Sequence, residues 1–441
     1  MILALRPALR RVAWTPSKAC PAQKRLAQFA LHELLIPIGK QLRPLSSLMG
    51  DDASRSRDDA EALTSDLHTC DAAGLHRVGA TFYGDREAPL IRDGAPRVLL
   101  VLPAAAVRYP PCFRGAKDQV ISGIECVTLG VQDLDAALHL YRDVCGFRVE
   151  SDTRAAVSLL SVWGLAPYTD VRLVELSRDG YAFGRIRLAT FADGAGPVTR
   201  QDHGDGAPDL PTAAGPKALD LYVAPPLSAT IGILEGAGCT LRAGPIRFVV
   251  RDTESEEALL TGPGEVPLLL MVGHRHPLRA QRNEPAAGRT SEVATVSVIV
   301  ADLAATRRFY ADGLGLHGVD IDDELQGTER ERVCRLFGVP ADTRVTLVLF
   351  RDPAQPSGKV LGVHFHERTT AALTHPMQPG NIGVNLFSTR CAHLEALRER
   401  LQANGLAEHL PITHVALGDG MPARVMLARG PNGELFEFIE R

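Results

Sequence analysis

One short pattern occurs twice in this chain, 169 residues apart, and it constrains the fold more than any other feature. In each copy an Asp-Leu pair is followed by a Tyr, a Gly and an apolar residue: Asp133, Leu134, Tyr141, Gly146 and Phe147, then Asp302, Leu303, Tyr310, Gly315 and Leu316. A second matched block lies 174 residues apart, where Gly164, Thr169, Val171 and Leu173 correspond to Gly338, Thr343, Val345 and Leu347. A duplicated unit is one folding design used twice. The architecture is therefore built from repeated modules.

Composition fits a soluble globular protein of two or three domains. The chain has 441 residues, of which 45% are hydrophobic, and this share is typical of a sizeable core. A net charge of −4 gives no basic surface for nucleic acid. No apolar run approaches the roughly 18 residues of a membrane span. The 8 cysteines form no CxxC pair, so we expect reduced thiols and a cytoplasmic location.

Residues 1–119 differ from the rest of the sequence. Up to His32 there is no Asp or Glu, whereas Arg and Lys recur, a bias that resembles a mitochondrial transit peptide. The alternative is an extension of low order, because residues 51–75 are polar and show little apolar periodicity. We predict that residues 1–119 lack a core of their own and that a chain starting near Gln119 stays folded. If the protein is eukaryotic and the basic start is a transit peptide, the location is mitochondrial.

From residue 120 onward, four similar modules follow one another. In the first, alternation and capping signals predict a strand at Glu125–Val131, a helix capped by Asp133, a short helix at Thr153–Trp163 and strands at Val171–Leu176 and Arg185–Phe191. The second has a strand at Ala218–Val223, a helix at Ser228–Ala237 and a strand at Val266–Val272. The third has a strand at Val296–Val300, helices at Asp302–Asp312 and Thr328–Phe337, and strands at Val345–Phe350 and Val360–Phe365. The fourth has a strand at Ile382–Phe387, a helix at His393–Ala403 and a strand at Glu434–Ile439.

These modules predict an α+β fold of four βαβββ units paired into two cupped-sheet domains. The predicted domains are residues 120–280 and 290–441, joined by the linker His274–Arg289. Consecutive modules are expected to share a sheet, and the two domains are expected to superpose with Asp133 and Asp302 at equivalent helix starts.

An Asp-Leu cap before a helix that carries Tyr, with a closing Pro-x-Gly-x-x-x-Glu strand, resembles the vicinal oxygen chelate superfamily. That superfamily contains glyoxalases, extradiol dioxygenases and bleomycin resistance proteins, and the resemblance covers about residues 120–441. It implies that two modules surround a cavity. It also implies metal ligands from a His or Gln seven residues before the cap Asp and from a Glu on the closing strand.

This sequence departs from the implied ligand pattern. Seven residues before the caps stand Cys126 and Thr295, the second module offers Ala218 or Asp220, and the fourth offers Asn381 or Ile382. The closing strands carry Arg187, Leu268, Leu361 and Glu437, so only Glu437 keeps the expected ligand type. An extradiol or glyoxalase centre needs three converging donors. If a metal binds at all, we expect a divalent Fe, Mn, Ni or Zn.

The candidate site residues follow from this comparison. We predict Glu437 and Thr295 as catalytic, with Thr295 holding a substrate oxygen while Glu437 moves a proton; the alternative for Glu437 is a carboxylate at the strand end. Substrate-binding candidates are Asn381, Arg187, Cys126 and Asp220. Arg187 is either an acid clamp or solvent-facing, and Cys126 is also consistent with a buried small side chain.

His364 and His366 lie two apart on one side of a strand, and together with Glu437 they are second-rank metal candidates. Satisfied histidines near a strand end are the alternative reading.

Two classes of function remain. The first is a glyoxalase-like or dioxygenase-like enzyme with a degenerate metal site that acts on a small carbonyl or aromatic substrate, which the single-chain, four-module layout favours. The second is a metal-free small-molecule binding or resistance protein. In both, the partner is a small molecule rather than nucleic acid or membrane, and the chain is a monomer or homodimer.

Overall fold

The computed structural model describes residues 35–38, 41–44, 121–178, 181–192, 194–251, 253–275, 289–317, 321–353, 355, 357–368, 371–417 and 421–441. Two compact units divide the chain: residues 1–114 with 280–282, and residues 115–279 with 283–441. In the first unit, β1 (Leu35–Ile38) and β2 (Gln41–Pro44) form an antiparallel hairpin. The prediction of low order in residues 1–119 otherwise falls outside the described residues.

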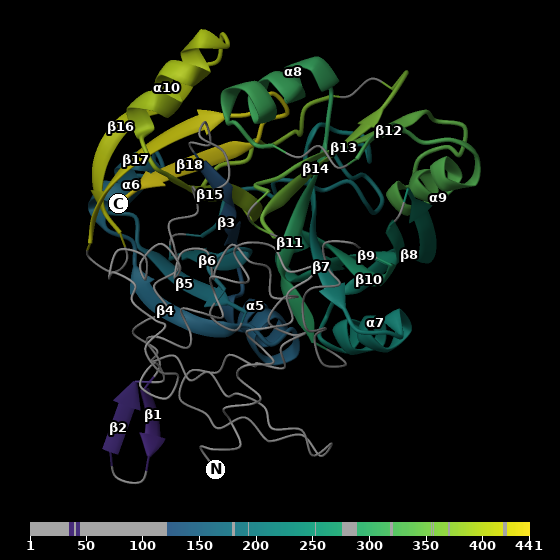
Figure 1. The fold of residues 1–441 in the computed structure, drawn as a ribbon. Coiled ribbons are helices and arrows are strands. Elements are labelled where there is room, and N and C mark those ends of the chain that lie inside the picture. Colours follow the sequence, from purple (N-terminus) through teal and green to yellow (C-terminus); the bar gives the residue numbers. More distant parts are fainter. Residues whose placement is uncertain are drawn as a thin grey trace, which may run out of the picture. The chain divides into compact units, whose positions relative to one another are not determined.

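The second unit contains the four modules, labelled in Figure 1. Module one has β3 (Ile121–Gly130), α5 (Leu134–Leu138), π-helical η3 (His139–Val144), β4 (Arg148–Arg154), α6 (Val157–Val162), β5 (Val171–Ser177) and β6 (Arg185–Phe191). Module two has β7 (Gly215–Val223), α7 (Leu227–Gly236), β8 (Thr240–Val250), β9 (Thr253–Gly262), the 3-10 turn η4 (Pro263–Glu265) and β10 (Val266–Arg275). Module three has β11 (Thr290–Ile299), α8 (Leu303–Arg307), π-helical η6 (Arg308–Gly313), β12 (Asp322–Glu324), α9 (Gly327–Phe337), β13 (Val345–Phe350) and β14 (Lys359–Phe365). Module four has β15 (Gly383–Cys391), α10 (Leu394–Ala403), β16 (Glu408–Ala416), β17 (Pro422–Arg429) and β18 (Leu435–Glu440).

The two Asp caps are confirmed as equivalent helix starts. The Asp133 carboxylate accepts a hydrogen bond from Ala136 N at 2.9 Å, and that of Asp302 accepts one from Ala305 N at 3.0 Å. Both helices then widen into a π-helical turn that buries Tyr141 or Tyr310. The helix predicted at Thr153–Trp163 begins later, at Val157, because its first residues extend β4.

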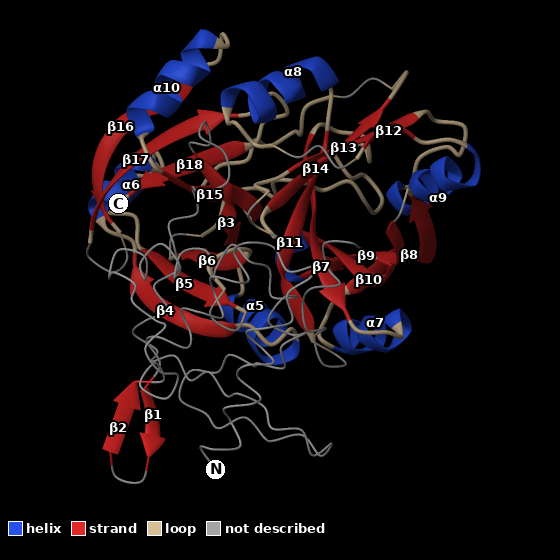
Figure 2. Cartoon of the chain, viewed as in Figure 1, coloured by secondary structure: helices blue, strands red, loops and turns tan. Residues whose placement is uncertain are grey.

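The α+β class with two eight-stranded mixed sheets is confirmed, but the modules pair differently from the prediction. One sheet has the order β16-β17-β18-β15-β3-β6-β5-β4 and joins modules one and four. The other has the order β12-β13-β14-β11-β7-β10-β9-β8 and joins modules two and three. Figure 2 shows the strands of both sheets. The expectation that consecutive modules share a sheet is wrong.

Backbone contacts of the linker that follows β6 account for this pairing. Its residue Thr199 donates a backbone hydrogen bond to Ile382 O at 2.8 Å, just ahead of β15, and Val198 bridges to Ile382. The linker therefore runs beside module four before β7 begins in the other sheet. Within each sheet, the first strands of the two modules pair antiparallel, β3 with β15 and β7 with β11.

Each sheet bends until a helix spans its two edges. In the sheet of modules one and four, α6 packs against the edge strand β16, and Ala416 N donates to Ser158 Oγ at 3.0 Å. In the sheet of modules two and three, α9 contacts both β8 and β13, and Arg251 pairs with Asp323 at 2.5 Å across the two edges. We call the face covered by α6 or α9 the inner face of each sheet. No helix in the described residues is long and apolar enough to cross a membrane.

Candidate functional site

Four positions on the inner face of the sheet of modules one and four correspond by register. Thr128 on β3 lies beside Arg187 on the closing strand β6, and Ser388 on β15 lies beside Glu437 on the closing strand β18. Each module thus brings one hydroxyl and one charged side chain to the centre of the sheet. Sequence reasoning missed Thr128 and Ser388, because it placed the first-strand position at Cys126 and Asn381.

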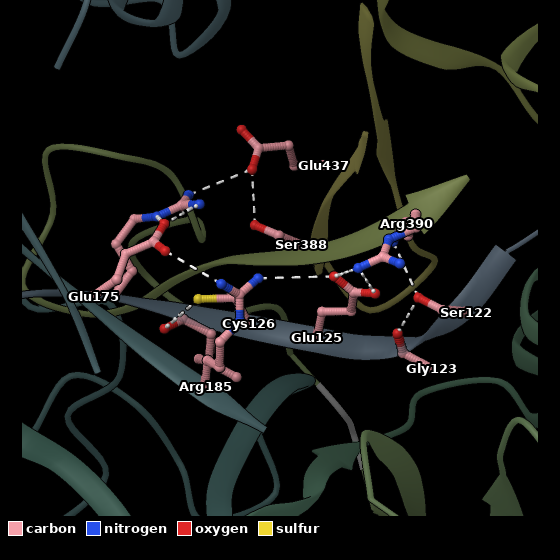
Figure 3. A network of polar contacts seen from close by, with 11 residues as sticks. Ser122, Gly123, Glu125, Cys126, Glu175, Arg185, Ser388, Arg390 and Glu437 are labelled. Atoms are coloured by element: carbon pink, nitrogen blue, oxygen red, sulfur yellow. Dashed lines mark hydrogen bonds and ion pairs between the residues drawn. The ribbon is translucent and has the colours of Figure 1, made fainter. Parts of the chain in front are cut away.

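Glu437 is fully buried and its carboxylate is engaged by three protein groups. Trp163 Nε1 donates to Oε1 at 3.0 Å, and Ser388 Oγ donates to Oε2 at 2.7 Å (Figure 3). Arg187 Nη1 donates to the same Oε2 at 3.4 Å. These contacts hold the carboxylate against the protein and leave it poorly placed to take a proton from a substrate.

Arg187 belongs to a ladder of alternating charges that crosses this inner face. Its guanidinium pairs with Glu175 at 3.0 Å as well as with Glu437. Arg185 continues the ladder at 3.2 Å from Glu175 and 3.7 Å from Glu125. Arg390 closes it at 3.1 Å from Glu125 (Figure 3). Three Arg and three Glu side chains therefore neutralise one another, and the prediction of a solvent-facing Arg187 is wrong.

The pKa shifts follow from burial and this pairing. Burial alone would lower the pKa of Arg187, but the neighbouring Glu175, Cys126 and Glu437 hold it above its usual value. Burial works to raise the pKa of Glu175, yet Arg187 and Arg185 bring it below its ordinary value. The Cys126 thiol has its pKa raised to about 11 by burial, so it is a buried small side chain rather than a nucleophile.

The donor set of this inner face does not fit a divalent metal. Its central atoms are two hydroxyls, one carboxylate and a guanidinium that stays protonated, and a fixed cation repels a second one. Across the described ranges, no group of three or more His, Cys, Asp and Glu side chains is placed to hold a metal ion.

The inner face of modules two and three has different chemistry. Asp220 on β7 is buried, and Ser297 Oγ on β11 lies 3.0 Å and 2.9 Å from its two carboxyl oxygens. Thr295, two residues before Ser297, is directly opposite Asp220 in the strand register and opposite Lys359 on its other side. The closing strands supply Leu269 and Leu361 where the other sheet has charges.

Carboxyl groups on this face are held in the neutral form. Burial raises the pKa of Asp220 well above its ordinary range, against the opposing effects of Ser297 and Lys359. Burial also raises the pKa of Glu257 to about 7, although Ser255 donates a 2.6 Å hydrogen bond to it. A neutral carboxylic acid carries an O–H and can donate a hydrogen bond.

Several predicted site residues do not come together. Thr295 and Glu437 lie in different sheets, so they do not form the single site predicted for them. Asn381 lies ahead of β15, where its side-chain amide donates to Pro376 O at 2.8 Å. Ser388, not Asn381, is the residue opposite Glu437.

The two histidines do lie side by side, with ring centroids 4.5 Å apart, but each is already engaged. His364 Nδ1 is 2.8 Å from Val300 O, and His366 Nε2 is 2.8 Å from Thr346 Oγ1. Because both are on β14, neither joins Glu437 in a metal site. Their contacts match the reading of satisfied histidines.

Comparison with known proteins places this geometry in a family. Residues 292–438 match the model of the Glyoxalase/Bleomycin resistance protein/Dioxygenase superfamily. Through these residues, the chain belongs to that superfamily. The match covers modules three and four, which contribute Thr295, Ser297 and Glu437. No curated protein sequence matches the chain.

Solved structures of the superfamily are similar at low identity. Glyoxalase I from Zea mays is 12% identical, with 72% of this chain and 92% of that chain covered and a TM-score of 0.44. A proposed dioxygenase from Bacillus subtilis is 12% identical, with 73% and 86% covered and a TM-score of 0.45. A mutant of 4-hydroxymandelate synthase from Streptomyces coelicolor is 14% identical, with 73% and 93% covered and a TM-score of 0.25.

Proposed function

We propose that this superfamily member binds a small organic molecule without a divalent metal. The observation that carries the proposal is the guanidinium of Arg187, bonded to Glu437 at the centre of one inner face. The other inner face offers neutral carboxyl and hydroxyl groups, which suit an uncharged ligand better than a metal. The cytoplasmic location and the monomeric or dimeric state stay predictions.

A metal-independent enzyme that acts on a carbonyl or aromatic substrate is the second candidate. The neutral Asp220 beside Ser297 favours it, because a buried carboxylic acid is a potential proton donor in catalysis. Asp220→Asn keeps the shape and removes the transferable proton. An enzyme of this kind loses turnover in the Asn variant and retains binding, whereas a binding protein has no turnover to lose.

Chelation tests the proposal. A panel of small neutral molecules is screened by shifts in thermal unfolding, before and after treatment with EDTA and dialysis. We expect the same compounds to bind with the same affinity in both samples. Loss of binding after EDTA, with recovery on adding Mn²⁺, Fe²⁺, Ni²⁺ or Zn²⁺, contradicts a metal-independent site.

A further inference from the structure

The inner face of modules two and three is mainly apolar. Side chains from four strands and α9 pack there as one cluster: Ala218, Leu269, Ile299, Leu361, Val363 and Phe337. A face of this kind favours the hydrocarbon part of a ligand, since binding removes apolar surface from water. It is interrupted by a small group of polar side chains centred on Thr295.

Thr295 is the polar side chain that the protein itself does not satisfy. It is only 5% exposed, and among the described residues none forms a hydrogen bond with its hydroxyl. It shares a face with Ser297, two residues further along β11, whose hydroxyl reaches Asp220. Buried hydroxyl groups usually have a partner, so an unmatched one on an inner face indicates that the partner is a ligand.

Asp220 supplies a second donor next to Thr295. The two residues are opposite each other on β7 and β11, and such neighbours have Cβ atoms about 5 Å apart. The Asp220 side chain is 1% exposed and has no cationic partner among its hydrogen bonds. Burial keeps it protonated, so its O–H points the same chemistry at the face as the threonine hydroxyl does.

Lys359, on the far side of Thr295, is engaged elsewhere. Its ammonium lies 6.0 Å from the centroid of the Tyr222 ring, one row away from Thr295. That position suits a cation–π contact. The two hydroxyl-type donors, rather than a charge, therefore define what the centre of the face recognises.

We propose that the inner face of modules two and three is a ligand site for an uncharged apolar carbonyl compound, whose oxygen accepts hydrogen bonds from Thr295 and Asp220. This assignment rests on the proposed small-molecule function and names its site and ligand class. The carbonyl oxygen has two lone pairs and takes one donor on each, while the hydrocarbon part of the ligand packs on the apolar cluster.

Acetophenone is the probe, with ethylbenzene as its oxygen-free analogue and benzoate as its anionic analogue. Binding to the full chain is measured by methyl NMR titration, which also locates the probe. We expect acetophenone to bind more tightly than either analogue, with shifts at Ile299 and Leu361. Thr295→Val removes the hydroxyl at constant shape and is expected to weaken acetophenone threefold to tenfold, about one hydrogen bond, without affecting ethylbenzene.

Two matched variants guard against a general structural effect. Thr295→Ser restores the hydroxyl and should bind acetophenone like the wild type. Thr240→Val makes the same substitution at an exposed position on β8 and should change nothing. Asp220→Asn retains a neutral donor, so its binding should stay within about threefold of wild type.

Three results overturn the assignment. One is equal acetophenone affinity in the wild type and in Thr295→Val. Another is tighter binding of benzoate than of acetophenone, which indicates an anion site at Lys359. The third is absence of binding by acetophenone and by the larger 2-acetonaphthone. If the probe binds with shifts confined to modules one and four, this site is wrong while the small-molecule proposal stands.

Discussion

Arg187 Nη1 lies 3.4 Å from Glu437 Oε2, and both side chains are almost completely buried. The pair joins β6 of module one to β18 of module four, at the centre of a sheet formed by segments far apart in the sequence. The guanidinium is a permanent positive charge where the resemblance implies a metal ligand. The pair therefore both stabilises the sheet and defines the chemistry of that inner face.

Arg187→Met is predicted to lower the free energy of unfolding by about 3–5 kcal/mol, because it leaves Glu437 and Glu175 without a buried cation. Urea denaturation followed by circular dichroism measures the change. The matched control is Arg172→Met on β5, whose ion pair with Asp152 is exposed to solvent. That control should cost at most about 1 kcal/mol. Similar small losses in both variants would show that the buried pair does not stabilise the sheet.

The sheet topology predicts that neither half of the chain folds alone. Residues 115–282 contain β3 and β7, whose antiparallel partners β15 and β11 lie in residues 283–441. Each half expressed separately should lack a cooperative unfolding transition and expose sheet edges. When the halves are mixed, they should form a one-to-one complex with the circular dichroism of the full chain. Two independently folded monomers, seen by size-exclusion chromatography and thermal unfolding, would support the pairing of consecutive modules.

Glu257 predicts a specific dependence of stability on pH. Its pKa is about 7 in the folded chain against 4.5 ordinarily, so between these values the folded state holds a proton that the unfolded state has released. The contribution to stability is complete below pH 4.5 and is lost as the pH rises through 7. Glu257→Gln removes this dependence.

The measurement is urea denaturation of both proteins at pH 5 and pH 8. The wild type should lose about 2–3 kcal/mol more than Glu257→Gln across this interval. Histidines and other carboxyl groups titrate in both proteins, so their effects cancel in the difference. Parallel losses in the two proteins would mean that Glu257 is ionised in the folded chain at neutral pH.

Local features of the fold could be predicted from the sequence, whereas the pairing of modules could not. Asp133 and Asp302 marked helix starts because an N-cap is decided by a few neighbouring residues. Which first strands meet depends on contacts between distant segments, such as Thr199 with Ile382. The alternating patterns of the first strands are compatible with either pairing, so the repeat did not distinguish them.

The candidate site was limited by register. Counting seven residues back from the cap led to Cys126, while the side chain opposite Arg187 is Thr128. In module four, α10 starts after His393 without a side-chain cap, and β15 has register shifts against β3. Asn381 was chosen for this reason, and Ser388 was missed. Thr295 was identified correctly as lying on an inner face, but its neighbour there is Asp220 rather than Glu437.

Metal stoichiometry tests the central claim most directly. The purified chain is incubated in turn with Mn²⁺, Fe²⁺, Ni²⁺ and Zn²⁺, dialysed against metal-free buffer and measured by inductively coupled plasma mass spectrometry. A metal-independent protein should retain far less than one ion per chain, with no difference between the wild type and Glu437→Gln. Retention of about one ion per chain, lost in Glu437→Gln, would contradict the account, because a metal would then bind where Arg187 is paired.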